Sequence, residues 1–286
     1  MSPERPALGL DPRVEAAFQG GDAKRHESNA HQSRAHPDSV ESGEALGRKP
    51  RVRLALPTGL RRLLVALGII VLLLVALPYL LVPLYRFGHP VSLPMLWRSL
   101  TGSRVERIYV PLNRIAPSLP LTVIIAEDGT FCRNRGVDFG AIREALHQAD
   151  DDLQEARGGS TITQQTVKNL FLWQGRSFIR KALEIPLALW MSLVLPKSRV
   201  LEIYLNIAEW GPNGEFGVEA GARHAFGKSA RDLTPQEAAE LTAMLPNPVH
   251  RSARQPSLQL RKLAGVYERR AAAHPSFDFC LRGRAP

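Results

Sequence analysis

Two carboxylates lie in apolar sequence surroundings where they could transfer protons. Glu127 ends the apolar run LTVIIAE (121–127), and Glu184 lies within FIRKALEIPLALW (178–190). Burial raises the pKa of a carboxyl group and suits it to acid–base work near neutral pH. Each also has a structural interpretation: Glu127 as the solvated end of a helix, and Glu184 as an ion-pair partner of residues one turn earlier.

Four cations lie in the same part of the chain: Lys168, Arg180, Lys181 and Lys197. Paired carboxylates are typical of chemistry at glycosidic bonds. Arg and Lys recognise phosphate and pyrophosphate groups strongly, and a simple glycosidase would not need them. The combination predicts an enzyme that acts on a phosphorylated, sugar-bearing substrate.

The stretch GGSTITQQ (158–165) has unusual hydrogen-bonding capacity on pliable backbone. Its two glycines permit close approach of the backbone to a ligand, because they carry no Cβ. Its side-chain donors and acceptors are Ser160, Thr161, Gln164 and Gln165. A helix N-terminus capped by Ser160 describes the same residues equally well, and both interpretations stay open.

An apolar segment precedes these residues. Residues 63–85 form 23 positions without a charge, enough for a helix to span a hydrocarbon core of about 30 Å. The alternative is a buried core helix, which is rarely apolar on every side. A cleaved signal peptide is disfavoured because the segment is too long and starts far from the N-terminus. The sequence therefore predicts a membrane anchor, and with it a lipid substrate.

The flanking charges predict the orientation of this anchor. Residues 48–62 carry six basic side chains and no acidic one, whereas only Arg86 and Arg98 follow closely. The positive-inside rule then places the N-terminus in the cytoplasm and the rest of the chain outside. The formal net charge of +10 is generically typical of nucleic-acid binding, but a domain outside the cytoplasm excludes that function.

Composition divides the chain into three predicted parts. Residues 1–50 have hardly any aliphatic clusters and are predicted to be a disordered cytoplasmic tail. Residues 51–86 form the basic collar and the transmembrane anchor, and residues 87–286 form one globular domain.

That domain is predicted to be mainly α-helical. TPQEAAELTAMLPNP (234–248) opens with Thr234 as N-cap, proline at the first helical position and Glu237 three residues after the cap. Residues 181–211 show apolar side chains at helical spacing on both sides of a break at Pro196 and Lys197. Strand signals are almost missing.

The chain has only two cysteines, Cys132 and Cys280. A disulfide framework is therefore excluded, and no spacing of Cys and His residues suggests a zinc site. One bridge between the two stays open, and we interpret Cys132 as a buried small residue and not as a nucleophile.

Five blocks of sequence together resemble the peptidoglycan glycosyltransferase family. They are EDGTFCRNRGVD (127–138), GGSTITQQ (158–165), RKALE (180–184), KSRVLEIYLN (197–206) and GARHAFGK (221–228). The resemblance covers roughly residues 95–255 and is to single-domain members, since no SxxK followed by KTG indicates a transpeptidase.

The resemblance implies a lysozyme-like helical fold that polymerises lipid II at the outer face of the inner membrane, with the domain in the periplasm. Glu127 matches the family's general base, and Glu184 matches a second carboxylate that organises the donor pyrophosphate. The growing glycan strand is the implied donor, and membrane lipid and cell-wall synthesis proteins are the expected partners. A divalent cation, Mg²⁺ or Mn²⁺, helps some members, but no dedicated metal cage is visible here.

The resemblance also implies a set of substrate-binding residues: Asp128, Gly159, Ser160, Thr161, Gln164, Gln165, Lys168, Arg180, Lys181, Lys197 and Asn206. One position departs from the family pattern, because Asn134 stands where a histidine is usual. Asn can form hydrogen bonds but cannot carry a proton or a charge, so we expect a structural role there.

Two other functions compete with a polymerase. A lytic or hydrolytic lysozyme-like enzyme would cleave the same polymer, but it would have no use for the cations of RKALE or a retained anchor. A non-enzymatic cell-wall scaffold would not need Glu127 and Glu184, and both are present.

Overall fold

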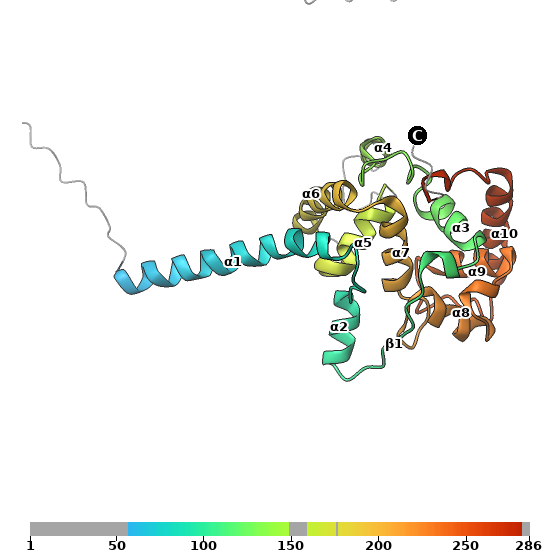
Figure 1. Cartoon of the computed structure of the whole chain (residues 1–286), viewed down its shortest axis with the longest axis horizontal. Coiled ribbons are helices and arrows are strands. Elements are labelled where there is room, and N and C mark those ends of the chain that lie inside the picture. Colours follow the sequence, from blue (N-terminus) through green and yellow to red (C-terminus); the bar gives the residue numbers. More distant parts are fainter. Residues whose placement is uncertain (1–56, 149–158, 176, 282–286) are drawn as a thin grey trace, which may run out of the picture. The chain divides into compact units, whose positions relative to one another are not determined.

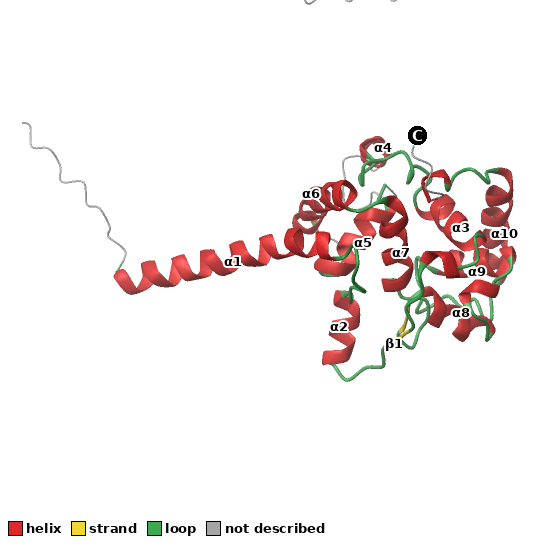
Figure 2. Ribbon diagram, viewed as in Figure 1, coloured by secondary structure: helices red, strands yellow, loops and turns green. Residues whose placement is uncertain are grey.

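The computed structural model describes residues 57–148, 159–175 and 177–281, and these residues are mostly helical (Figures 1 and 2). The α-helices are α1 (Thr58–Leu84), α2 (Leu93–Leu100), α3 (Ser118–Glu127), α4 (Phe139–Gln148), α5 (Ile162–Phe171), α6 (Phe178–Val194), α7 (Lys197–Ile207), α8 (Val218–Phe226), α9 (Pro235–Met244) and α10 (Leu258–Ala273). Short 3-10 helices are η1 (Leu112–Arg114), η2 (Ala230–Asp232) and η3 (Phe279–Leu281). The dipeptides β1 (Glu106–Arg107) and β2 (Glu215–Phe216) pair in parallel, with Glu106 opposite Glu215.

Helix α1 is the predicted anchor. It has 27 residues, a length of about 40 Å, and its mean hydropathy reaches 2.9 over its most apolar window. Only 6% of that window is buried, so the core-helix alternative is wrong. The helix is long and apolar enough to cross a membrane. The predicted tail, residues 1–50, and the first residues of the basic collar lie outside the described residues.

The end of α1 is fixed to the domain that follows it. The indole Nε1 of Trp190 on α6 donates a hydrogen bond of 3.0 Å to the carbonyl oxygen of Tyr79. The guanidinium of Arg199 on α7 donates to the carbonyl oxygens of Tyr85 and Gly88. The Tyr79 carbonyl has no partner within the helix because the residue four positions later, Pro83, has no amide N–H. Tyr85 and Gly88 lie just after the helix, where carbonyl groups also need partners from elsewhere.

Six of the other helices pack in two groups of three, which can be located by their labels in Figure 1. Helix α3 packs against α9 and α10, whereas α5 packs against α6 and α7. Val123 and Leu241 are fully buried in the first group, and Val167 and Leu201 in the second. Residues on α3 and α5 can therefore meet between the two groups.

Two predicted helix boundaries are confirmed. Thr234 caps α9 in a capping box with Glu237, whose side chain accepts from the Thr234 amide at 2.9 Å. Helix α6 ends at Val194, and Pro196 is the extended N-cap of α7. Proline suits this place because the first amides of a helix have no intrahelical partner.

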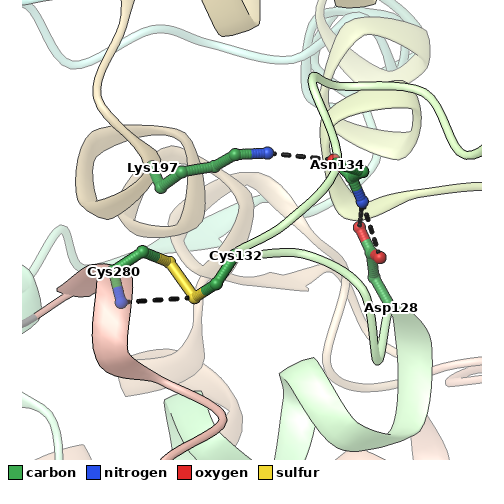
Figure 3. The surroundings of a disulfide bond; sticks show 5 residues. All are labelled: Asp128, Cys132, Asn134, Lys197 and Cys280. Atoms are coloured by element: carbon green, nitrogen blue, oxygen red, sulfur yellow. Dashed lines mark hydrogen bonds between the residues drawn. A yellow bond between two sulfur atoms is a disulfide. The ribbon is translucent and has the colours of Figure 1, made fainter. Parts of the chain in front are cut away.

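A disulfide joins the loop after α3 to the C-terminal 3-10 helix. Cys132 and Cys280 are bonded with their Cα atoms 5.4 Å apart, and the Cys280 amide also donates to Cys132 Sγ at 3.4 Å (Figure 3). The bridge that the sequence left open is therefore formed, and the expectation that Cys132 is a buried small residue is wrong. The side chain is partly buried, and its position beside the other cysteine explains why it is paired.

We expect the double variant Cys132→Ser, Cys280→Ser to lose about 2–5 kcal/mol of unfolding free energy, because the bond closes a loop across 148 positions of the chain. Denaturant unfolding in detergent, with and without reductant, measures the loss. Reductant should destabilise the wild type and leave the variant unchanged. Equal stability of wild type and variant under oxidising conditions would contradict a structural disulfide.

Candidate active site

The loop after α3 is held against the N-terminus of α5. The amide of Ile162 donates to Asp128 Oδ2 at 3.0 Å, and Thr161 Oγ1 donates to the Gly136 carbonyl oxygen at 2.6 Å. A helix N-terminus has free amides and a positive dipole end, which favour a carboxylate there. Gly136 has φ 93°, and a Cβ at this position would lie 2.4 Å from the Ala188 carbonyl oxygen. Only glycine fits this close approach.

The cap of α5 is Thr161, so the prediction that Ser160 is the cap is wrong by one residue. Thr161 forms a capping box with Gln164, and both side chains are buried. Ser160 lies outside the helix, where its Oγ accepts a hydrogen bond of 2.9 Å from Lys181 Nζ. The Thr161 hydroxyl therefore caps the helix, and the Ser160 hydroxyl is left to contact Lys181.

Glu127 is the last residue of α3 and is partly buried. Gln165 Nε2 on α5 donates to its Oε2 at 3.0 Å. Burial raises the pKa of Glu127, whereas the Gln165 hydrogen bond and the charge of Lys168 lower it, and Asp128 next to it raises it slightly. The carboxylate is thus made more basic by desolvation and is still stabilised in its ionised form.

Glu184 on α6 is almost fully buried, with 2% of its surface exposed. It forms an ion pair with Arg180, and its Oε2 lies 3.3 Å from Lys181 Nζ. The predicted sharing of one helix face by these three residues is confirmed. Burial, followed by the charges of Arg180 and Lys168, lowers the pKa of Lys181 to about 8.

Lys168 on α5 lies close enough to Glu127 and to Arg180 for both charges to shift its pKa. Burial and the nearby charge of Arg180 lower the pKa of Lys168, and the charge of Glu127 raises it. Lys168 is thus attracted by Glu127 and repelled by Arg180, which is the ion-pair partner of Glu184. Partly buried positive charge therefore lies near both predicted catalytic residues: Lys168 near Glu127, and Arg180 and Lys181 beside Glu184.

Asn134 joins Asp128 to Lys197 (Figure 3). Its Nδ2 donates to Asp128 Oδ1 and Oδ2 at 2.9 and 3.1 Å, and its Oδ1 accepts from Lys197 Nζ at 3.0 Å. Lys197 Nζ also lies 4.6 Å from the centre of the Phe131 ring. Burial lowers the pKa of Lys197 to about 8, partly opposed by the charge of Asp128. A neutral amide suits this position because one end must donate and the other must accept.

The structure brings together most of the predicted site residues through direct contacts or charges: Glu127, Asp128, Ser160, Gln165, Lys168, Arg180, Lys181, Glu184 and Lys197. Gly159 lies beside this group with φ 77° and close to the Ala141 carbonyl oxygen. Gly158 lies outside the described residues.

Besides Asp128, three predicted substrate-binding residues are buried. Thr161 and Gln164 hold the start of α5, as described above. The fully buried Asn206 on α7 bonds to the backbone of Val110 at both ends of its amide, and to the Glu202 carbonyl oxygen. In this structure these side chains fix the backbone around the site.

Tyr204 is a site residue that sequence reasoning missed. It is buried on α7, and its hydroxyl donates to Gln165 Oε1 at 3.1 Å. An aromatic residue at helical spacing is usually a core residue, so the spacing gives no functional signal. The available signal is the hydroxyl group, because a buried phenol needs a hydrogen-bond partner.

The residues present do not fit a protein-held divalent cation. In the described ranges, no group of three or more His, Cys, Asp or Glu side chains could hold a metal ion. The groups that contact Glu184 are cations, whereas Mg²⁺ prefers oxygen ligands.

Fold and site together define a helical enzyme with an apolar anchor, two desolvated carboxylates and a set of cations between them. The chain matches the Transglycosylase family over residues 95–271. It is 57% identical to the biosynthetic peptidoglycan transglycosylase of Nitrobacter hamburgensis over 73% of this chain and 93% of the relative. The corresponding protein of Rhodopseudomonas palustris (strain HaA2) is 55% identical over 74% and 93%, and that of Rhizobium meliloti 48% identical over 74% and 90%. The chain belongs to the transglycosylase family and is a glycosyltransferase.

We expect Lys197→Met to raise the unfolding free energy at neutral pH by roughly 1 kcal/mol, since it removes a partly desolvated charge and keeps an apolar stem over Phe131. The expected gain is small because this side chain is only partly buried, so water screens part of its charge.

The pH dependence tests the cause of this gain. The folded-state pKa of Lys197 is about 8, below the unfolded value of 10.5. The gain should be complete below about pH 8 and should disappear as pH rises toward 10.5. Lys228→Met on the surface is the control, and a gain of the same size there, or a gain that does not vary with pH, would contradict the explanation.

Proposed function

We propose that this glycosyltransferase polymerises lipid II into peptidoglycan strands at the outer face of the inner membrane. The observation that carries the proposal is a base held from α5 beside a buried cationic cluster on α6. Gln165 on α5 holds Glu127, and Glu184 on the adjacent α6 pairs with Arg180 and Lys181. A transfer reaction with a pyrophosphate leaving group needs both a base and a cationic site. The names of the relatives, which are biosynthetic peptidoglycan transglycosylases, support the substrate class.

In the proposed reaction, Glu127 is the general base. It accepts the proton of the acceptor's 4-hydroxyl as that oxygen bonds to the donor's anomeric carbon. The bond from the anomeric carbon to the pyrophosphate oxygen breaks with inversion, and its electron pair leaves with undecaprenyl pyrophosphate. The raised pKa of Glu127 supports this role, because a base is most effective when its pKa approaches the working pH.

The cations would hold the donor pyrophosphate. Arg180, Lys181 and Lys168 present positive charge from two adjacent helices, and the predicted cation Lys197 lies on the Asp128 side. Glu184 would act through Arg180 and Lys181 by fixing their positions. Partial burial strengthens such charge–phosphate interactions.

The anchor supports a substrate carried by a membrane lipid. Helix α1 packs against α6, the helix that carries Arg180 and Glu184. The basic residues before α1 favour a cytoplasmic N-terminus, and the disulfide favours an oxidising compartment for the domain. We therefore propose a single-pass inner-membrane protein with residues 87–286 as its periplasmic catalytic domain.

We expect Glu127→Gln to abolish polymerisation, with a loss of at least about 100-fold in kcat, because the amide cannot accept the proton. Purified protein in detergent with labelled lipid II, followed on a gel, measures the glycan ladder. Glu106→Gln is the matched control and should keep wild-type activity; Glu106 lies on the partly exposed strand β1 and pairs with Arg104.

The same assay separates the alternatives. Wild type that leaves lipid II untouched and trims preformed glycan would instead be a lytic enzyme. Wild type that binds lipid II and catalyses neither reaction would be a scaffold. An active Glu127→Gln variant would contradict the assignment of the base.

We expect the KM for lipid II to rise several-fold as pH rises above about 8, because Lys181 and Lys197 lose their charges there. Lys181→Arg should weaken this rise, since a guanidinium stays charged at alkaline pH. Initial rates from about pH 7 to about pH 9.5 at several lipid II concentrations measure KM. Lys228→Arg, whose lysine pairs with Glu237 on the surface, is the control, and a constant wild-type KM would contradict pyrophosphate binding by these lysines.

A further inference from the structure

The amide of Gln165 lies between an acid and a phenol. Its Nε2 donates to Glu127 Oε2 at 3.0 Å, and its Oε1 accepts from the Tyr204 hydroxyl at 3.1 Å. The three residues come from α3, α5 and α7, so the chain of hydrogen bonds crosses from one helix group to the other.

The partners at the two ends fix which way the amide points. An ionised carboxylate only accepts hydrogen bonds, so it requires the NH₂ end of Gln165. The reversed amide would place its oxygen against the carboxylate, where only the protonated form of Glu127 could donate to it. The Tyr204 hydroxyl stabilises the first orientation by donating its single proton to Oε1.

Tyr204 can act only as a neutral donor here. Its ring is buried, with 2% of its surface exposed. Burial and the charge of Glu127 raise the pKa of Tyr204 well above its ordinary value. The phenol therefore keeps its proton throughout the working pH range, and its position in the core leaves the hydroxyl little freedom to turn elsewhere.

We propose that Tyr204 is a positioning residue that holds the Gln165 amide with its NH₂ toward Glu127 and so keeps the base ionised. This role rests on the proposed function of Glu127 as the general base. Desolvation opposes ionisation of a partly buried carboxyl group, and hydrogen bonds to the charged form offset it. The hydrogen bond from Gln165 is such a contact, and Tyr204 determines whether the amide can make it.

Other charged or titratable groups also face Glu127 and must be separated from this effect. Asp128 is the next residue, Lys168 approaches from α5, and Tyr267 on α10 is close enough for its pKa to be raised by Glu127. The hydrogen bonds of the Gln165 amide go to Glu127 and to Tyr204. Changing Tyr204 therefore tests the amide while it leaves these neighbours in place.

The test is the pH dependence of kcat for lipid II polymerisation by full-length Tyr204→Phe. The substitution keeps the buried ring and removes only the hydroxyl. Without its donor, the amide can reverse, and the pKa of Glu127 rises. We expect the pH at which kcat falls on the acidic side to be higher by on the order of one unit than in the wild type. At pH values below the wild-type midpoint the variant's kcat should be about tenfold lower than that of the wild type, and at higher pH it should recover almost completely. KM should change little.

A double-mutant cycle tests whether Tyr204 acts through Gln165. Gln165→Met keeps the length of the side chain and removes the amide, so it should move the acidic limb at least as far as Tyr204→Phe. In the Gln165→Met background, Tyr204→Phe should then cause no further shift. An additional shift of full size would overturn the proposal, because Tyr204 would then be acting on Glu127 by another route.

Tyr109→Phe is the matched control. It also removes a hydroxyl bonded to a carboxylate, Glu202, at 2.6 Å, but without contact to Glu127, so its acidic limb should stay in place. If Tyr204→Phe lowers kcat equally at every pH, the residue is merely structural and the proposal is overturned. If Glu127→Gln is inactive and the limb of Tyr204→Phe does not move, the positioning role alone fails. An active Glu127→Gln variant would remove both the base and this role.

Discussion

The arrangement of this site depends on how the N-terminus of α5 is capped. Asp128 accepts from the first helical amide, Ile162, and Thr161 donates to Gly136 further along the same loop. These two hydrogen bonds fix the loop after α3 at both ends of a nine-residue stretch, 128–136. Because Gln165 lies one turn beyond the cap, the same contacts place its amide opposite Glu127. A local helix-capping requirement thus aligns residues from two separately packed helix groups.

Desolvation then shifts the pKa values of acids and bases toward each other. It raises the pKa of Glu127 and lowers those of Lys181 and Lys197 to about 8. Carboxylate and ammonium groups therefore titrate closer to neutral pH than they would in water. Glu184 offsets part of the cost of burying the cations, because it pairs with Arg180 and Lys181 at almost complete burial. The same low-dielectric surroundings serve proton transfer and anion binding.

The sequence predicts those features that depend on neighbouring residues. The Thr234 capping box and the helix break at Pro196 are readable because each involves contacts within a few positions. The alternative that Ser160 caps α5 is one residue early, because Thr161 accepts from the Gln164 amide and forms a capping box with that residue. The spacing of Thr161 and Gln164 carries this signal in the sequence. Contacts across the fold were not readable. Asn206 was predicted to bind substrate but is buried against another segment, and Tyr204 resembles any core aromatic until its partner across the helix interface is known.

The disulfide imposes an order on how this protein matures. The loop that carries Cys132 is made early, but the cysteine that closes the bridge follows 148 residues later. Until that second segment has been synthesised, has folded and has met an oxidant, the loop that bears Asp128 and Asn134 has only its non-covalent contacts. A nascent or reduced chain therefore has a less constrained site than the finished protein. Both the completion of the chain and the redox state of its compartment therefore determine whether the disulfide restrains the loop 128–136 of the site.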